Sequence, residues 1–171
     1  WPERVDIIKW INRILSWEPN ARIVLHGVSM GAATVLMASG EDLPGNVKAV
    51  IADCGYTSEW DEFQREADAL HIPWFPVLNA TSVLSKIRDG YDFKQASALA
   101  QVKKSRIPTL FIHGSSDELV PYSMLGELYA AAACEKEELT VEGAGHALSS
   151  SVAPTLYWRT VEDFIAKYLD R

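Results

Sequence analysis

Short runs of hydrophobic residues alternate along this chain with segments in which hydrophobic residues recur at helical spacing. The runs predict four buried strands, which cover residues 23–25, 47–54, 106–113 and 139–142. The spacing predicts helices that begin at Glu3 and that cover residues 30–39 and 122–134. The first strand and the helix at 30–39 are joined by one short turn, and this turn carries the chain's first chemical signal.

The turn reads HGVSMG over residues 26–31 and contains a G-x-S-x-G pattern. Between a strand and a helix, this pattern is typical of the nucleophile elbow of serine hydrolases. The elbow strains the serine backbone, and we expect only glycines to leave enough room beside it. Because a helix opens directly after Ser29, the N–H of Met30 and the positive helix end point to where an oxyanion would form. Ser29 is therefore a candidate nucleophile and Met30 a candidate oxyanion donor.

The alternative is a tight connection in which Ser29 only caps the helix. Chain order favours the elbow, because this fold carries its serine, acid and histidine in that order along the chain. Asp117 lies in the loop after the third predicted strand, and His146 lies in the loop after the fourth. Pro121 fits the first turn of the next helix, so the first of these loops is short and keeps the carboxylate near the sheet edge. Neighbouring glycines allow His146 to swing toward Ser29.

In this arrangement His146 would take the proton of Ser29 as a general base and later protonate the leaving group. Asp117 would hold the other ring nitrogen and stabilise the imidazolium. Serine is a poor nucleophile without such a base, and histidine titrates close enough to neutrality to accept and return the proton. The three residues predict nucleophilic catalysis that requires neither a metal nor a cofactor.

Other carboxylates and imidazoles remain alternatives for the acid and the base. Asp53 also ends a strand, where some lipases carry their acid, although the motif favours Asp117. We expect Glu118 to face solvent and Glu142 to lie inside its strand. The remaining histidines are His26, His71 and His113. His26 and His113 each end a predicted strand just before a glycine, a position where histidines typically have a structural role.

Three segments besides the elbow carry a resemblance to a known family. They are IADCGYTS at 51–58, HGSSDELVP at 113–121 and GAGH at 143–146. Over nearly its whole length the chain resembles the C-terminal part of an α/β-hydrolase, and it is similar to bacterial cell-surface hydrolases, dienelactone hydrolases and prolyl-oligopeptidase relatives. The resemblance implies an α/β fold, with a mostly parallel sheet flanked by helices. It also implies a serine hydrolase that works through an acyl-enzyme intermediate.

Complete members of this family carry several strands and a helix ahead of the point where this chain begins, so we expect its N-terminal strands to be missing. The second oxyanion N–H of the fold comes from a loop in that part. Without those strands, the strand at 23–25 would lie at an open sheet edge. We therefore expect the isolated chain to self-associate through this edge and to show weak or no turnover.

Residues 58–105 form an insertion that is longer than a usual crossover between strands. We expect a capped helix from Ser58, an aromatic and proline-rich stretch at 71–76, and a second helix toward Lys86. Such an excursion suits a small lid over the active site. The candidates to line an acyl or aromatic pocket are Trp60, Phe63, Trp74, Phe75 and Leu78. The alternative is that these side chains are ordinary core.

The composition and charge of the chain limit the classes of molecule that it is expected to bind. Of the 171 residues, 48% are hydrophobic and 23% are charged, and the formal net charge is −7. The longest basic cluster is the pair Lys103 and Lys104, which disfavours nucleic acid, anionic membranes and polyanionic substrates. Cys54 and Cys134 lack metal-ligand spacing and are interpreted as buried free thiols. Localisation stays open between the cytoplasm and an anchored or extracellular site.

Two functional classes fit these features. The first is a hydrolase that cleaves a small-molecule ester, thioester or amide, with esters favoured because their leaving group is easier to expel. The second is an acyltransferase, or a binding protein that keeps the fold and has lost catalysis.

Overall fold

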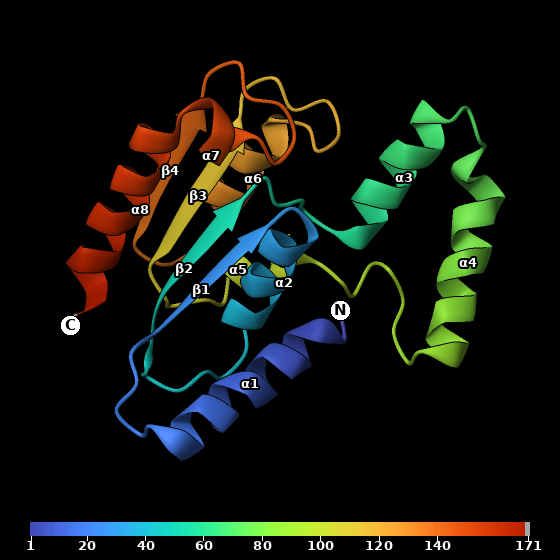
Figure 1. The fold of residues 1–171 in the computed structure, drawn as a ribbon. Helices are drawn as coiled ribbons and strands as arrows, with labels where there is room; N and C mark the ends of the chain where they lie inside the picture. Colours follow the sequence, from blue (N-terminus) through green and yellow to red (C-terminus); the bar gives the residue numbers. More distant parts are fainter. Residues whose placement is uncertain (170–171) are drawn as a thin grey trace.

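The computed structural model describes residues 1–169 and shows one parallel sheet between layers of helices (Figure 1). The sheet has the order β1-β2-β3-β4, and all of its pairings are parallel. Its strands are β1 (Ile23–Val28), β2 (Val47–Asp53), β3 (Thr109–Gly114) and β4 (Lys136–Val141). The α/β class with a mostly parallel sheet is thus confirmed.

Helices cover both faces of this sheet. One face carries α1 (Glu3–Trp17), α2 (Met30–Ser39), α5 (Ala98–Val102) and α6 (Ser123–Ala131). The other face carries α8 (Pro154–Leu169), which follows the short helix α7 (Ser149–Val152). Successive strand side chains point to opposite faces, so Leu25 packs in the core under α2 while Val24 packs in the core under α8.

Several predicted boundaries differ from the structure near the third and fourth strands. The third strand begins at Thr109 and not at residue 106, and the fourth begins at Lys136 and not at residue 139. The helix predicted to run to residue 134 ends at Ala131, where the backbone of Ala132 turns extended (φ −64°, ψ 129°), and Lys136 caps that end by donating to the carbonyls of Tyr129 (2.6 Å) and Ala132 (2.9 Å). The fourth strand ends at Val141, so Glu142 lies just outside it and is exposed, contrary to the expectation.

The insertion forms a helical hairpin that projects from the carboxyl edge of the sheet (Figure 1). It consists of α3 (Glu59–Ala69) and α4 (Trp74–Arg88). As expected, Ser58 caps the first of these helices, with its hydroxyl accepting from the Asp61 N–H at 3.1 Å. A bridge between Ser58 and Ser97 closes the base of the hairpin, and α5 returns the chain to the sheet.

Strand β1 forms one edge of the sheet, with β2 as its partner strand among the described residues. Its sequence, IVLHGV, contains no lysine, glutamate or proline of the kind that protects an edge. The self-association expected through this edge stays a prediction. A separate finding concerns membranes: within residues 1–169, no helix combines the length and the apolar character needed to cross a bilayer.

Candidate active site

The carboxyl ends of β1, β3 and β4 bring three distant side chains together. The Oγ of Ser29 lies 2.7 Å from Nε2 of His146, and Nδ1 of His146 lies 2.9 Å from Oδ2 of Asp117. Ser29 and His146 are 117 positions apart in the sequence, so the parallel sheet is what juxtaposes them. The three sequence candidates thus form one continuous hydrogen-bonded chain.

Ser29 sits in the strained turn that an elbow requires. Its backbone has φ 56° and ψ −119°, in the region that non-glycine residues rarely adopt. Its backbone N–H donates to the carbonyl of Asp53 at 2.8 Å, and its side chain makes no capping bond to α2. The geometry therefore disagrees with the capping alternative, because the hydroxyl is directed to His146 instead.

The two glycines of the elbow are not equivalent. A Cβ on Gly27 would lie 2.2 Å from the carbonyl oxygen of Gly31, so only glycine fits at position 27. A Cβ on Gly31 would meet nothing within 4 Å. The expectation that both glycines provide room beside the serine is therefore correct for Gly27 and wrong for Gly31 among the described residues.

Asp117 is held as a buried, fully hydrogen-bonded carboxylate. Its Oδ1 accepts from the backbone N–H groups of Leu119 and Val120, each at 2.9 Å. Its Oδ2 accepts from His146 and lies 3.2 Å from Nε2 of His113, and its side chain has 0% exposure. These donors compensate the cost of burying the charge and fix the carboxylate in place.

His113 is a member of this network that the sequence analysis treated only as a structural histidine. Its Nε2 lies 3.0 Å from the carbonyl oxygen of Val120, so that nitrogen carries a proton, and it also lies 3.2 Å from Oδ2 of Asp117. The residue is 1% exposed. The spacing of four residues between His113 and Asp117, across the end of a strand, was the available signal for this contact.

The loop that carries His146 is anchored to the strand next to the elbow. The Ser149 hydroxyl donates to Oδ1 of Asp53 at 3.0 Å, and both residues are buried. Burial raises the pKa of Asp53 above its ordinary value of 3.8, and the bond from Ser149 opposes that rise. Asp53, the rival acid, thus supports the histidine loop, while Asp117 contacts the imidazole itself.

Cys54 lies directly beside these residues, which the sequence analysis did not foresee. Its sulfur and the nearest ligand atoms of Asp117 and His146 all lie within 4.8 Å of one another, a spacing compatible with a metal ion. Burial raises the pKa of the Cys54 thiol to about 12, with a further contribution from Asp53. Asp117 is already saturated with donors, and both ring nitrogens of His146 are engaged by Ser29 and Asp117, so the donor set fits a metal ion poorly.

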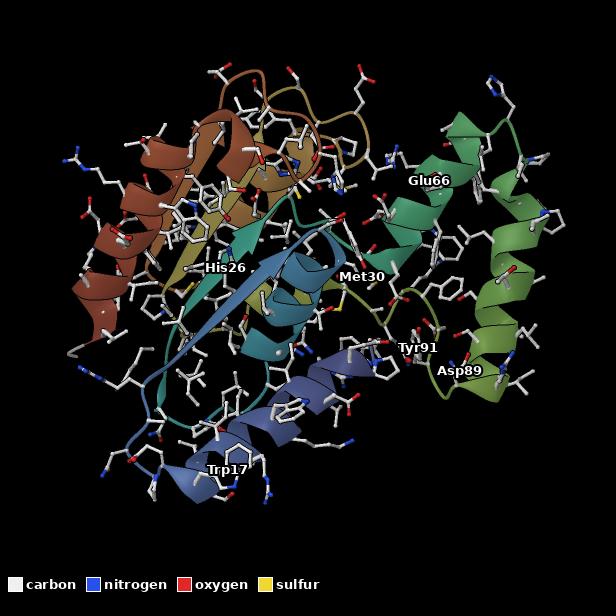
Figure 2. The ribbon with its side chains drawn as sticks, in the orientation of Figure 1. Trp17, His26, Met30, Glu66, Asp89 and Tyr91 are labelled. Atoms are coloured by element: carbon white, nitrogen blue, oxygen red, sulfur yellow. The ribbon has the colours of Figure 1, made fainter. Side chains whose placement is uncertain are left out.

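The start of α2 supplies donors for a developing negative charge. Met30 is the first residue of this helix, and the first N–H groups of a helix lack partners within it. The positive end of the helix dipole adds to their effect. The Met30 side chain is 67% exposed and lies on the side of the sheet from which the hairpin projects (Figure 2). This geometry suits the predicted oxyanion role.

The remaining candidates for the acid and the base lie elsewhere. Glu118 is exposed, and Glu142 accepts from the Ser115 hydroxyl at 3.0 Å. His26 pairs with the hydroxyl of Tyr157 at 3.0 Å, and His71 is exposed at the tip of the hairpin.

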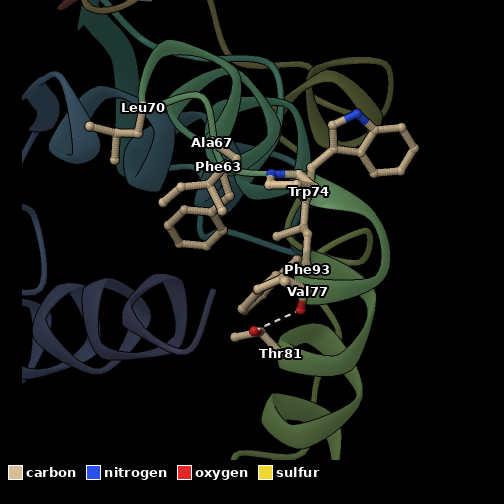
Figure 3. A pocket seen from close by; sticks show the side chains of 10 residues that line it. Phe63, Ala67, Leu70, Trp74, Val77, Thr81 and Phe93 are labelled. Atoms are coloured by element: carbon tan, nitrogen blue, oxygen red, sulfur yellow. Dashed lines mark hydrogen bonds between the residues drawn. The ribbon is translucent and has the colours of Figure 1, made fainter.

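The predicted pocket residues divide into two groups. Phe63, Trp74 and Leu78 line a cavity between α3 and α4 (Figure 3). Trp60 lies outside this cavity, with the ammonium of Lys94 4.4 Å from the centre of its ring. Phe75 also lies outside it and is 65% exposed. None of the described residues that line the cavity belongs to the hydrogen-bonded chain of Ser29.

Comparison with known proteins places this chain in a family. Residues 4–171 match the prolyl oligopeptidase family. The chain is 31% identical over 166 residues to the uncharacterized protein YqkD of Bacillus subtilis. The aligned region covers 95% of this chain and 54% of YqkD. The chain spans about half the length of the curated relatives it matches.

Solved structures show the same fold at lower sequence identity. The Pyrococcus furiosus esterase Pf2001 superposes with a TM-score of 0.73 at 18% identity, over 98% of this chain and 62% of the esterase. The Pyrococcus horikoshii acylaminoacyl peptidase gives a TM-score of 0.73 at 19% identity, over 97% of this chain and 27% of the peptidase. This chain therefore belongs to the prolyl oligopeptidase family, as an α/β-hydrolase domain of the serine hydrolases.

Proposed function

We propose that this chain hydrolyses small-molecule carboxylic esters, with Ser29 as the nucleophile, His146 as the general base and Asp117 as the acid that orients the base. The observation that carries the proposal is the unbroken path from the Ser29 hydroxyl through the imidazole to a buried carboxylate, with links of 2.7 and 2.9 Å. The first link is within the range in which a nucleophile passes its proton to its base, and the second is a hydrogen bond that orients that base.

The hydrogen-bond partners determine the direction of proton transfer. Asp117 is an acceptor, so Nδ1 of His146 carries a proton and Nε2 is free to accept from Ser29. As Ser29 Oγ bonds to the substrate carbonyl carbon, its proton passes to Nε2, and the carbonyl oxygen becomes an oxyanion near the N–H of Met30. When the carbon–oxygen bond to the alcohol breaks, His146 returns the proton to the departing alcohol.

Water completes the cycle. His146 takes a proton from the water as it attacks the acyl carbon, and it then returns a proton to Ser29 Oγ as the acid is released. Asp117 stabilises the imidazolium in both halves of the reaction. Esters are preferred over amides in this proposal because an alcohol is easier to expel than an amine.

A fluorophosphonate probe tests the proposal, because it reacts once with an activated serine and registers even slow chemistry. We expect stoichiometric phosphonylation of Ser29, located by mass spectrometry of the modified peptide, and at most slow hydrolysis of nitrophenyl acetate, in keeping with the weak turnover expected from the sequence. Ser29→Ala abolishes both. Ser16→Ala is the matched control, because its exposed hydroxyl on α1 bonds within its own helix to the carbonyl of Arg13 and lies outside the proposed machinery. Absence of label on Ser29 in the folded chain would refute the proposal.

A further inference from the structure

Helix α4 is the outer helix of the hairpin (Figure 1), and most of its apolar side chains are exposed. Its buried residues are Leu78, Ser82 and Ser85. The opposite face carries an apolar stripe, here called the outer stripe, whose exposed members are Val77, Ala80, Val83, Leu84 and Ile87. In α8 the pattern is reversed, because its buried residues are Tyr157, Val161, Phe164 and Tyr168. Thus α4 exposes the kind of apolar stripe that α8 buries.

Hydrogen bonds to the segment after α4 hold the helix in this rotation. The Ser82 hydroxyl accepts from the backbone N–H of Phe93 at 3.1 Å, and the Ser85 hydroxyl donates to the carbonyl of Tyr91 at 3.0 Å. Turning the helix so that the outer stripe faced α3 would break both bonds and leave buried polar groups without partners. A single copy of the chain therefore keeps the outer stripe in water, where apolar surface is unfavourable.

The outer stripe is complementary to a second copy of itself. Val77, Ala80, Leu84 and Ile87 have the alternating spacing of three and four residues that forms the seam of a coiled coil. When two α4 helices lie antiparallel about a two-fold axis at residue 82, Val77 faces the partner's Ile87 and Ala80 faces the partner's Leu84. The smallest side chain of the seam thus lies opposite a large one, as interdigitated packing requires. A two-fold axis uses the same patch on both copies.

The two helices of the hairpin carry opposite charges. The α3 helix has five acidic side chains and one basic side chain, whereas α4 has two basic side chains, Lys86 and Arg88, and none that is acidic. The last acidic residues of α3, Glu66 and Asp68, lie near the tip of the hairpin, where α4 begins. Antiparallel pairing brings the basic end of each α4 to the acidic tip of the partner's hairpin, and parallel pairing would bring the two basic ends together. A lipid surface offers these acidic side chains no such compensation.

We propose that the outer stripe of α4 is a homodimer contact, in which the α4 helices of two copies of this chain pack antiparallel about a two-fold axis at residue 82. The two hairpins together then form a four-helix bundle. This surface is separate from the β1 edge, and the inference does not depend on the proposed function. One helix per copy buries less than a standard interface of about 1,600 Å², so the dimer is weak and dissociates on dilution.

Sedimentation velocity of the purified chain tests this contact. We expect the wild-type chain to pass from monomer to dimer between about 1 and 100 µM, since small interfaces give dissociation constants in the micromolar range or above. Leu84→Glu places two desolvated carboxylates in the seam and is expected to raise the dissociation constant at least about 10-fold. Its side chain is 60% exposed in the single copy, so circular dichroism should show an unchanged fold. Asn79→Glu is the matched control, because it adds the same charge to an exposed position of α4 outside the outer stripe and keeps the dimer.

Charge reversal tests the antiparallel orientation. Arg88→Glu and Asp68→Lys, both at exposed positions, are each expected to weaken the dimer several-fold, and the double variant is expected to restore it. A double variant as weak as either single variant would refute this orientation.

Three further results would overturn the inference. The first is a wild-type chain that stays monomeric to 100 µM, including one that instead binds phosphatidylcholine vesicles through Leu84, which would identify a membrane as the occupant. The second is association that survives Leu84→Glu in full, which would assign it to another surface such as the β1 edge. The third is an equal loss of the dimer in Leu84→Glu and Asn79→Glu, which would reflect added charge and not the outer stripe.

Discussion

The carboxyl edge of the sheet and the α3–α4 hairpin differ in how they hold their polar and apolar side chains. At the sheet edge the key groups are polar and buried, and Asp117 has 0% side-chain exposure with donors on both oxygens. On the hairpin the apolar groups are exposed, with Leu84 at 60% and Ile87 at 78%. Hydrogen bonds fix the geometry of the first region. The second region leaves large apolar side chains exposed to solvent.

The largest expected difference between the two regions concerns their histidines. His146→Ala removes the proposed base, and we expect the rate of Ser29 phosphonylation to fall by about 10⁶-fold, as in a comparable triad. His71→Ala, at the exposed hairpin tip, changes that rate by less than about twofold. The measurement is labelling by the fluorophosphonate probe under pseudo-first-order conditions. Equal effects of the two variants would remove the distinction between the regions.

Within the hairpin, stability is expected to depend on the few buried side chains. Phe93→Ala deletes the ring that packs on Phe63, and we expect a loss of about 3 kcal/mol in the free energy of unfolding. Ile87→Ala changes an exposed residue of the same hairpin and should stay within about 0.5 kcal/mol of wild type. Urea denaturation measures both. A large effect of Ile87→Ala would show that α4 is covered in solution.

At the sheet edge, the two glycines of the elbow provide an internal comparison. Gly27→Ala forces a Cβ against the backbone of Gly31 and is expected to destabilise the chain by about 2 kcal/mol. Gly31→Ala meets open space inside a helix and should leave stability unchanged or raise it by about 0.5–1 kcal/mol. Thermal unfolding followed by circular dichroism distinguishes the two outcomes, and equal losses would contradict the described close approach.

The smallest expected effect is a change of stability with pH at Asp53. Burial raises the pKa of this carboxyl above 3.8, so the folded chain holds the proton more tightly than the unfolded chain. Its contribution to stability is present below pH 3.8 and is lost as pH rises through the raised pKa. Asp53→Asn cannot titrate, so its stability relative to wild type should increase from pH 4 to pH 7. Urea denaturation across that range provides the values, and a parallel pH dependence would count against a raised pKa.

Most of the fold and the three proposed catalytic residues were accessible from the sequence because their signals are local. Each residue follows an apolar run and lies in a glycine-rich loop, and parallel strands bring such loops to one edge. The long-range contacts that hold these residues in place could not be predicted from the sequence. The bond from Ser149 to Asp53 joins residues 96 positions apart. Cys54 and Ala147, the residue after His146, both have positive φ (49° and 56°), which no local sequence pattern indicated.

The hairpin was harder to predict for a different physical reason. Apolar residues at helical spacing bury equally well in a core or in a cavity, so spacing alone does not distinguish them. Phe63 and Trp74 line the cavity, whereas Trp60 and Phe75 from the same stretches do not. Only the packing of α3 on α4 separates these pairs.

The central claim is that Asp117, and not Asp53, orients the base of a reactive serine. Its most direct test is the rate of Ser29 phosphonylation in Asp117→Asn and Asp53→Asn, two isosteric changes of buried carboxylates, one in the loop after β3 and one at the end of the neighbouring strand β2. We predict a fall of about 10⁴-fold for Asp117→Asn, as when a triad aspartate is replaced by its amide, and less than about 10-fold for Asp53→Asn. A larger loss for Asp53→Asn than for Asp117→Asn would contradict the account.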